Sequence, residues 1–328
     1  MTRRDLAVGT TAMILTTGLW ATVYFAPLLL PGVPATAVAG GRYLAFGLAS
    51  LVLAWRLGVR FDRVPWGKAF TYAVTGFVGY FLLLTLSVKV AGPTLTVVVM
   101  GAGPVLYSAL GSRDAAERRR LVGPGAVIVT GVVLAEAAGA TGLHGIGWGR
   151  ALGGLALTLV AMLSWIWYGL DNARLLAERR DLKPQVWTSV VGVATGVVSL
   201  PLVAFALAGA GGGSSVTESR TVLLLAALGL GPALIGSLGW NVASSRLSPA
   251  TAGQLIVLEP LFALTYAAVW TGHAPTGAAL VGQVLLLTGA AWGVWVTASR
   301  RGGAAAGVGR TGPRRWRRVG PRLSAAGS

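Results

Sequence analysis

The chain is 328 residues long, with 54% apolar and 11% charged residues, a mean hydropathy of +0.70 and a net charge of +17. Soluble domains carry about a quarter charged residues, so this composition indicates an integral membrane protein. There is no cysteine, and both histidines, His144 and His273, fall in predicted loops. Disulfides and thiolate metal sites are therefore excluded, and neither a histidine-based metal site nor a cofactor is expected.

Ten apolar segments are long enough to cross about 30 Å of hydrocarbon as helices of about 20 residues. Backbone polar groups find no partner in lipid, so each segment is predicted to be a helix. The predicted fold class is an all-α integral membrane protein with ten transmembrane helices. The predicted spans are 6–30, 35–55, 69–88, 92–111, 121–140, 151–171, 187–209, 221–244, 250–271 and 277–298.

Loops rich in lysine and arginine alternate along the chain with loops that contain few of them. With the N-terminus in the cytoplasm, 23 of the 27 cations fall on the cytoplasmic side, whereas Lys89, Arg150 and Arg220 fall outside and Arg42 lies within a span. This asymmetry follows the positive-inside rule and predicts a multi-pass protein of the cytoplasmic (inner) membrane with both termini in the cytoplasm. The basic tail, residues 299–328, is predicted to be disordered; its attraction to membrane lipids explains its charge better than nucleic-acid binding, so no nucleic-acid partner is expected.

Two stretches match without gaps at an offset of 156 residues. Pro93 aligns with Pro249 at the start of a span, and Pro104 aligns with Pro260 near the middle of the membrane. The chain is therefore predicted to hold two five-helix repeats, residues 1–140 and 149–298. Because five is odd, the second repeat is inverted in the membrane. Secondary transporters are built this way, with the substrate site near the membrane centre between the repeats.

Polar residues inside spans are candidates for a substrate site, because polar groups in lipid tend to face the bundle interior. Trp20 and Tyr24 share one side of the first span, and Trp240 and Asn241 cluster in the eighth. Each pair also suits plain helix packing. Arg42, in the second span, has two competing roles: it binds a substrate carboxylate or phosphate, or it pairs structurally with an acid or with helix-end carbonyls.

Glu259 is the only acid predicted deep inside a span, in the apolar run GQLIVLEPLFALTYAAVW. A carboxylate at that depth costs several kcal/mol and marks a functional site. Phe262, Tyr266 and Trp270 follow it on one helical face. The stripe suits a cavity for an amphipathic or cationic substrate, or ordinary helix packing. Glu259 is also the candidate for a coupling proton, and for an ion pair with Arg42.

A GxxxG motif in the seventh span, Gly192 and Gly196, is typical of close helix packing and is compatible with a homodimer.

Further motifs recur in the same order in both repeats. They are Leu19-Trp20-Ala21, Pro34, Arg42, Pro104, Glu117, Gly125 and Gly131 in the first, and Trp240, Leu258-Glu259-Pro260, Gly282 and Gly289 in the second. In this order and spacing they resemble the EamA-type, ten-helix members of the drug/metabolite transporter superfamily, over about residues 6–298. His273 stands where the family usually has glutamate, which puts the contact of that loop in doubt.

The resemblance implies a secondary transporter that moves small organic metabolites, amino-acid- or drug-like, by alternating access, with export and proton coupling left open. No catalytic set is present, so an enzyme is not expected. The alternative is a non-transporting membrane scaffold or sensor, whose expected mark, a folded soluble domain, is missing from the sequence. The residues predicted to contact the substrate are Glu259, Arg42, Trp20, Tyr24, Phe262, Tyr266, Trp240 and Asn241.

Overall fold

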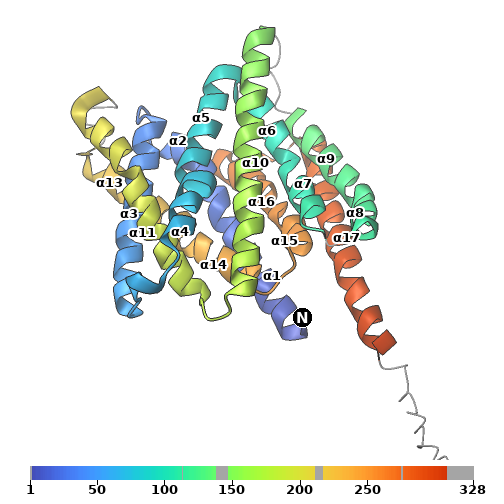
Figure 1. Cartoon of the computed structure of the whole chain (residues 1–328). Helices are drawn as coiled ribbons and strands as arrows, with labels where there is room; N and C mark the ends of the chain where they lie inside the picture. Colours follow the sequence, from blue (N-terminus) through green and yellow to red (C-terminus); the bar gives the residue numbers. More distant parts are fainter. Residues whose placement is uncertain (1, 113, 138–146, 211–216, 275, 309–328) are drawn as a thin grey trace, which may run out of the picture.

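The computed structural model describes residues 2–112, 114–137, 147–210, 217–274 and 276–308. These ranges form a bundle of helices joined by turns, without a strand among them (Figure 1). Up to residue 137 the helices are α1 (Arg3–Ala21), α2 (Ala26–Leu29), α3 (Ala35–Arg56), α4 (Trp66–Tyr72), α5 (Gly79–Ala91), α6 (Pro93–Gly101), α7 (Gly103–Leu110), α8 (Ala115–Arg120) and α9 (Val122–Ala137). From residue 148 they are α10 (Trp148–Glu178), α11 (Pro184–Phe205), α13 (Ser219–Leu228), α14 (Gly236–Ser244), α15 (Pro249–Ile256), α16 (Leu258–Thr271) and α17 (Gly277–Val308).

Eight helical segments of the described chain are long and apolar enough to cross a membrane. They are Arg3–Phe25, Ala35–Arg56, Trp66–Ala91, Trp148–Glu178, Pro184–Ala208, Ser219–Ser244, Pro249–Thr271 and Gly277–Thr297, and they coincide with eight of the predicted spans. The fourth and fifth predicted spans coincide with shorter apolar segments, Leu95–Leu110 and Val122–Ala135. The last helix, α17, continues past the predicted end of its span at residue 298 to Val308. Residues 309–328 of the predicted tail lie outside the described residues.

Several of the long segments are interrupted. The short 3₁₀ turns η1 (Thr22–Phe25) and η2 (Phe61–Arg63) follow α1 and α3, and π turns occur at η3 (Ala73–Val78), η4 (Ala206–Ala210) and η5 (Gly229–Ile235). A proline clashes with the carbonyl four residues before it. Pro104 and Pro260 therefore account for the breaks that follow α6, at Ala102, and α15, at Val257. Pro232 lies inside η5 in the same way.

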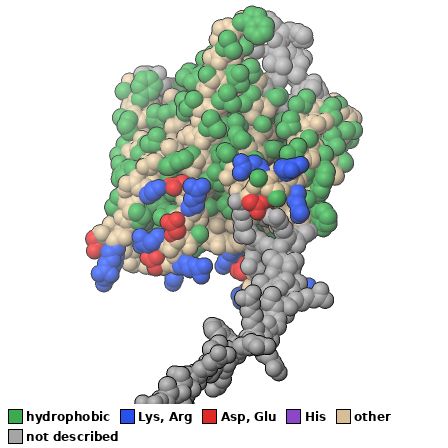
Figure 2. Space-filling view, turned by 45° about the vertical axis from the view of Figure 1, so that its right-hand side comes forward, with side chains coloured by type: hydrophobic (Ala, Val, Ile, Leu, Met, Phe, Trp, Pro, Cys, Tyr) green, Lys and Arg blue, Asp and Glu red, His purple; other side chains and the backbone are tan. Residues whose placement is uncertain are grey.

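Charged side chains gather at one end of the bundle. Figure 2 shows most lysines and arginines toward the lower part of the molecule, below a surface of hydrophobic side chains. We call this the basic end; α3 finishes there at Arg56, and α10 approaches it with Arg174 in its last turns. At the other end Arg150 donates a hydrogen bond of 3.0 Å to the Val90 carbonyl, one residue from Lys89. The two ends therefore differ in charge, as the loop pattern predicts.

Two helix pairs pack backbone against backbone. A Cβ built on Gly196 of α11 would lie 2.7 Å from the Cα of Gly47 in α3, and one on Gly47 would lie 2.5 Å from the Cα of Gly196. The pair α9 and α17 is similar, because a Cβ on Gly282 would lie 2.6 Å from the carbonyl oxygen of Gly131. Glycines allow helices in a membrane to approach this closely. The GxxxG face of α11 is thus covered by α3 of the same chain and is not free for a homodimer.

Candidate functional site

Four aromatic rings from four helices meet in the middle of the bundle. Trp20 of α1 lies 5.7 Å from Trp240 of α14, and Trp165 of α10 lies 6.2 Å from Trp20 and 5.7 Å from Trp240. Tyr107 of α7 completes the cluster, 5.8 Å from Trp165 and 5.9 Å from Trp240. We call these four residues the aromatic cluster. Its offset and edge-to-face arrangements are those that aromatic pairs favour.

The aromatic cluster is closed in this conformation. Trp240 and Tyr107 are fully buried, whereas Trp20 is partly exposed. The Trp20 indole donates a hydrogen bond of 3.2 Å to the carbonyl of Pro232, inside the π turn η5. The structure therefore brings the two predicted tryptophans together, but Trp240 has no exposed surface with which to contact a substrate here.

Glu259 lies in the first turn of α16, directly after the break at Val257. Its carboxylate is half-buried, and the hydroxyl of Tyr24, which belongs to the 3₁₀ turn η1, lies close enough to interact with it. Tyr24 itself is 54% exposed. Two of the predicted site residues, from the first and the ninth spans, therefore lie close together.

The aromatic stripe of α16 packs against α1. The Tyr266 hydroxyl donates a hydrogen bond of 3.3 Å to the Gly18 carbonyl, and the rings of Phe262 and Tyr266 stack at 5.9 Å. Trp270, at the end of the stripe, is 59% exposed and lies 6.1 Å from Phe25. Phe262 and Tyr266 are half-buried. The stripe thus serves helix packing, and it begins one turn after Glu259 on the same helix.

Arg42 is buried in α3, with 8% of its surface exposed. Its guanidinium lies 4.4 Å from the ring centroid of Tyr43 and 4.7 Å from that of Phe81. Nη2 donates a hydrogen bond of 2.7 Å to the Tyr43 hydroxyl, whereas Nε and Nη1 are buried without a hydrogen-bond partner. Stacking on two rings stabilises the cation. Two donor nitrogens remain, and a guanidinium N–H donor suits an oxygen of a carboxylate or phosphate.

Arg42 and Glu259 do not form an ion pair. The ion pairs within the described part of the chain are Arg63–Asp62, Lys68–Asp171 and Arg179–Asp181. The predicted pairing of Arg42 with Glu259, or with helix-end carbonyls, is therefore not what the structure shows. Tyr80 of α5 lies in the neighbourhood of both residues, because its hydroxyl interacts electrostatically with Glu259 and with Arg42. Sequence reasoning missed Tyr80, since nothing in the apolar run GYFLLLTLSV sets its hydroxyl apart.

Asn241 belongs to a buried hydrogen-bond network between α10, α11 and α14. Its side-chain carbonyl accepts from Asn172 Nδ2 at 2.8 Å, and its Nδ2 donates to Thr188 Oγ1 at 2.8 Å. Trp187 Nε1 donates to Asn172 Oδ1, also at 2.8 Å. All four side chains are buried. The network uses both functional groups of the Asn241 amide, so this residue packs helices together in the present conformation.

Replacing Asn241 by leucine is expected to destabilise the protein. The substitution keeps the side-chain volume but leaves Asn172 Nδ2 buried without its acceptor, at a cost of about 1–3 kcal/mol. Thermal unfolding in detergent, followed by intrinsic fluorescence, should show a lower Tm. Ser245→Ala is the control, because Ser245 follows α14, is exposed and bonds only the nearby Val242 carbonyl. An unchanged Tm for Asn241→Leu would contradict the assignment.

Comparison with known proteins adds relatives of the same size. No family model matches the chain. The inner membrane protein YtfF of Escherichia coli (strain K12) is 29% identical over 290 residues, covering 83% of this chain and 90% of the relative. A probable terminal-alkyne amino-acid exporter of Streptantibioticus cattleyicolor is 27% identical over 285 residues, covering 85% of this chain and 90% of the relative. The chain is a multi-pass membrane protein homologous to these two.

A solved crystal structure has the same fold. It superposes with a TM-score of 0.72 at 19% identity and covers 91% of this chain and 99% of its own. At that identity the likeness concerns the arrangement of helices alone.

One further charged site lies inside a helix where the sequence predicted a helix end. Asp171 was expected at the boundary of the sixth span, but α10 continues two turns further, to Glu178. Its carboxylate pairs with Lys68 and accepts a hydrogen bond of 2.7 Å from the Tyr72 hydroxyl. Glu259 is therefore not the only acid inside a long helix. Asp171 and Lys68 are 103 residues apart, so no local pattern could have paired them.

Proposed function

We propose that this chain is a secondary transporter of the EamA type that exports small amino-acid-like molecules across the inner membrane by alternating access. The observation that carries the proposal is Arg42, a guanidinium buried inside a span with two donor nitrogens, Nε and Nη1, that have no hydrogen-bond partner. Both relatives are membrane proteins, and one is named as a probable amino-acid exporter. A homologous amino-acid exporter supports a zwitterionic substrate.

Two inverted five-helix repeats are part of this proposal, and helix irregularities support them. The π turns η3 and η5 begin at Ala73 and Gly229, which are 156 residues apart. The prolines that break the fourth and ninth spans, Pro104 and Pro260, are separated by the same number of residues. Irregular backbone at the same two places in each repeat is typical of transporters whose binding site lies between the repeats.

In the proposed site the two ends of an amino acid meet opposite charges. The substrate carboxylate accepts a hydrogen bond from one of the two unpartnered nitrogens of Arg42, Nε or Nη1. The substrate ammonium group lies toward the Glu259 carboxylate, and the Tyr80 hydroxyl interacts electrostatically with both charged side chains. Half-buried Phe262 and Tyr266 border the site next to Glu259 and provide apolar surface for the substrate side chain. Trp20 forms the floor toward the basic end.

The conformation fits one state of an alternating-access cycle. Trp240 lies one turn before the end of α14 at Ser244, and Tyr107 lies one turn before the end of α7 at Leu110. The aromatic cluster and the Lys68–Asp171 pair therefore close the path from the basic end, whereas exposed Tyr24 and Trp270 border the opposite side. With the basic end in the cytoplasm, as the positive-inside rule favours, this is the state that releases substrate to the outside.

The proposal is tested by export from cells that overproduce the protein. Cells carrying the wild type or an empty vector are loaded with amino acids as dipeptides, and amino acids in the medium are measured over time. We expect a small set to leave faster with the wild type, with saturable kinetics. A scaffold or sensor, the alternative function, would bind without any flux, and equal efflux from both strains for every amino acid would contradict the proposal.

Neutralising Glu259 is expected to reduce this flux strongly. A hydrogen bond to a charged group contributes about 1.5–3 kcal/mol, so Glu259→Gln should lower transport about 10- to 100-fold. The matched control is Glu178→Gln, which removes one exposed carboxylate at the end of α10. Measuring efflux with and without an imposed pH gradient separates two roles. Loss of the gradient effect in Glu259→Gln assigns the coupling proton to Glu259, and unchanged flux in that variant would make the carboxylate structural.

A further inference from the structure

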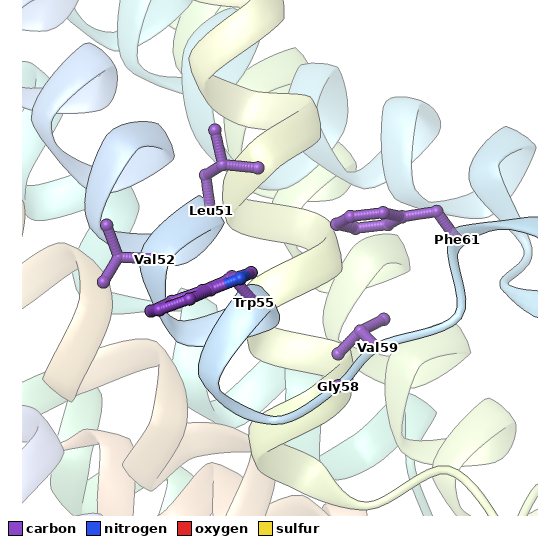
Figure 3. A pocket seen from close by; sticks show the side chains of 6 residues that line it. All are labelled: Leu51, Val52, Trp55, Gly58, Val59 and Phe61. Atoms are coloured by element: carbon purple, nitrogen blue, oxygen red, sulfur yellow. The ribbon is translucent and has the colours of Figure 1, made fainter.

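The basic end of α3 carries a surface hollow that the transport site does not explain. It measures about 460 Å³ and is lined by Leu51, Val52, Trp55, Gly58, Val59 and Phe61 (Figure 3). Figure 3 shows Trp55 and Phe61 on two sides of the hollow, one from the helix and the other from the chain that follows it. The lining is apolar apart from backbone atoms and the Trp55 indole.

A fixed turn builds this hollow. Gly58 adopts a left-handed conformation, with φ of 62°, which favours glycine. The Val59 amide donates to the Ala54 carbonyl at 3.0 Å, so the chain folds back along the last turn of α3. Phe61 is then held by Trp66, whose indole donates to the Phe61 carbonyl at 2.9 Å. The rim of the hollow is therefore preformed rather than a chance gap between mobile side chains.

The hollow opens toward lipid. Leu48, Val52 and Trp55 are 57%, 56% and 75% exposed, and they lie along one face of α3 at helical spacing. In a membrane-spanning helix, apolar residues that no other helix covers face the acyl chains of the bilayer. Trp55 lies one residue before the end of the span, where tryptophan is enriched at the boundary between hydrocarbon and headgroups. An acyl chain can therefore enter the hollow without leaving the membrane.

Two arginines lie next to the residues that line the hollow. Arg56 follows Trp55, with its guanidinium 5.8 Å from the Trp55 ring, and Arg60 stands between the lining residues Val59 and Phe61. Both arginines are exposed, and neither has a carboxylate within ion-pair distance in the described chain. Asp62 lies instead against Arg63, at 3.8 Å. A phosphate at this level would meet two guanidinium groups, each of which can bind it bidentately.

We propose that this hollow, the α3 groove, binds an anionic phospholipid. One acyl chain packs along Leu51, Val52 and Trp55, and the headgroup phosphate lies between Arg56 and Arg60. A headgroup that carries hydroxyl groups or a further negative charge beyond the phosphate is favoured. A choline headgroup is disfavoured because the two arginines repel its cation. The groove is separate from Arg42 and Glu259, so this inference stands even if the substrate proposed above is wrong.

The test uses native mass spectrometry of the purified, delipidated full-length protein titrated with phosphatidylglycerol or phosphatidylcholine. Each arginine near an anionic headgroup contributes about 1 kcal/mol, so the wild type is expected to prefer phosphatidylglycerol by roughly 10- to 30-fold. The variant Arg56→Gln/Arg60→Gln should lose that preference. Trp55→Ala should weaken both lipids by removing a wall of the groove.

The control is Arg119→Gln/Arg120→Gln, which removes the same charge from exposed positions on α8. An equal loss in this control would mean that only general attraction to anionic lipid operates, and it would overturn the proposal. Displacement of the lipid by excess inorganic phosphate would show that the site binds phosphate alone and does not need an acyl chain. This result would also overturn the proposal. Unchanged binding in Trp55→Ala would move the lipid elsewhere.

Discussion

Replacing Arg42 by methionine is expected to abolish transport while leaving the protein at least as stable as the wild type. The guanidinium is buried with two donor nitrogens unpartnered, and removing a buried charge that lacks an ion-pair partner often stabilises a protein. Methionine retains an unbranched, polarisable side chain between the rings of Tyr43 and Phe81. The binding of a substrate carboxylate depends on the charge and on the unpartnered donor nitrogens, so we expect a loss of about 100-fold or more in flux.

Lost flux with retained stability would indicate that Arg42 binds substrate, whereas lost stability would indicate a structural role. Efflux is measured in cells at matched protein level, and Tm is measured on the purified variants. Arg42→Lys keeps the charge but replaces the planar guanidinium by a single ammonium nitrogen, so it should give intermediate flux. Arg150→Met, at an exposed position in the first turn of α10, is the control. A collapse of Tm in Arg42→Met would show that the arginine stabilises the fold, and wild-type flux would remove it from the site.

A valine at Gly196 is expected to prevent folding. The new Cβ would lie 2.7 Å from the Cα of Gly47, where the contact is backbone and no side chain can turn away. Overpacking in a core costs about 1–3 kcal/mol even when side chains can adjust, and here two spans must separate. The amount of monodisperse protein after gel filtration in detergent should fall to background. A valine at Gly47 should act in the same way.

The control for the glycine variants is Gly149→Val. Gly149 lies in the first turn of α10, and a Cβ built there meets nothing within 4 Å. The control carries the same β-branched side chain in a helix, so it isolates the effect of helix approach. Monodisperse Gly196→Val protein with the Tm of the wild type would mean that α3 and α11 do not pack as closely as the structure places them.

Much of the architecture could be predicted because hydrocarbon imposes a simple rule. A long apolar run must be a helix, so most predicted spans coincide with long helices to within a few residues. Two segments are different: Pro104 breaks the fourth into α6 and α7, and Pro260 breaks the ninth into α15 and α16. Helix ends at the basic side were also missed, since the polar last turns of α10 are helical but not apolar. That error is why Asp171 was expected at a boundary.

The candidate site could be predicted only as separate residues. Glu259 and Arg42 stand out in sequence because charges in apolar runs are rare. Their neighbours could not be assigned: Tyr24 was predicted as a site residue, but its approach to Glu259 and the stacking of Arg42 on Tyr43 and Phe81 arise from tertiary packing that no spacing reveals. Asn241 shows the opposite case. It is as polar as a binding residue, yet its amide is used by Asn172 and Thr188.

The two glycine crossings have a consequence for how such a molecule can move. Gly47 and Gly196 join α3 to α11, and Gly131 and Gly282 join α9 to α17, so each tight contact unites one helix from either half of the chain. The halves are interleaved rather than docked side by side. A rocking motion that separated residues 1–140 from residues 149–298 would have to break both of these glycine contacts. Under the alternating access proposed above, we therefore expect the moving bodies to be mixed bundles that keep both glycine contacts, with η3, η5 and the breaks at Ala102 and Val257 as the hinges between them.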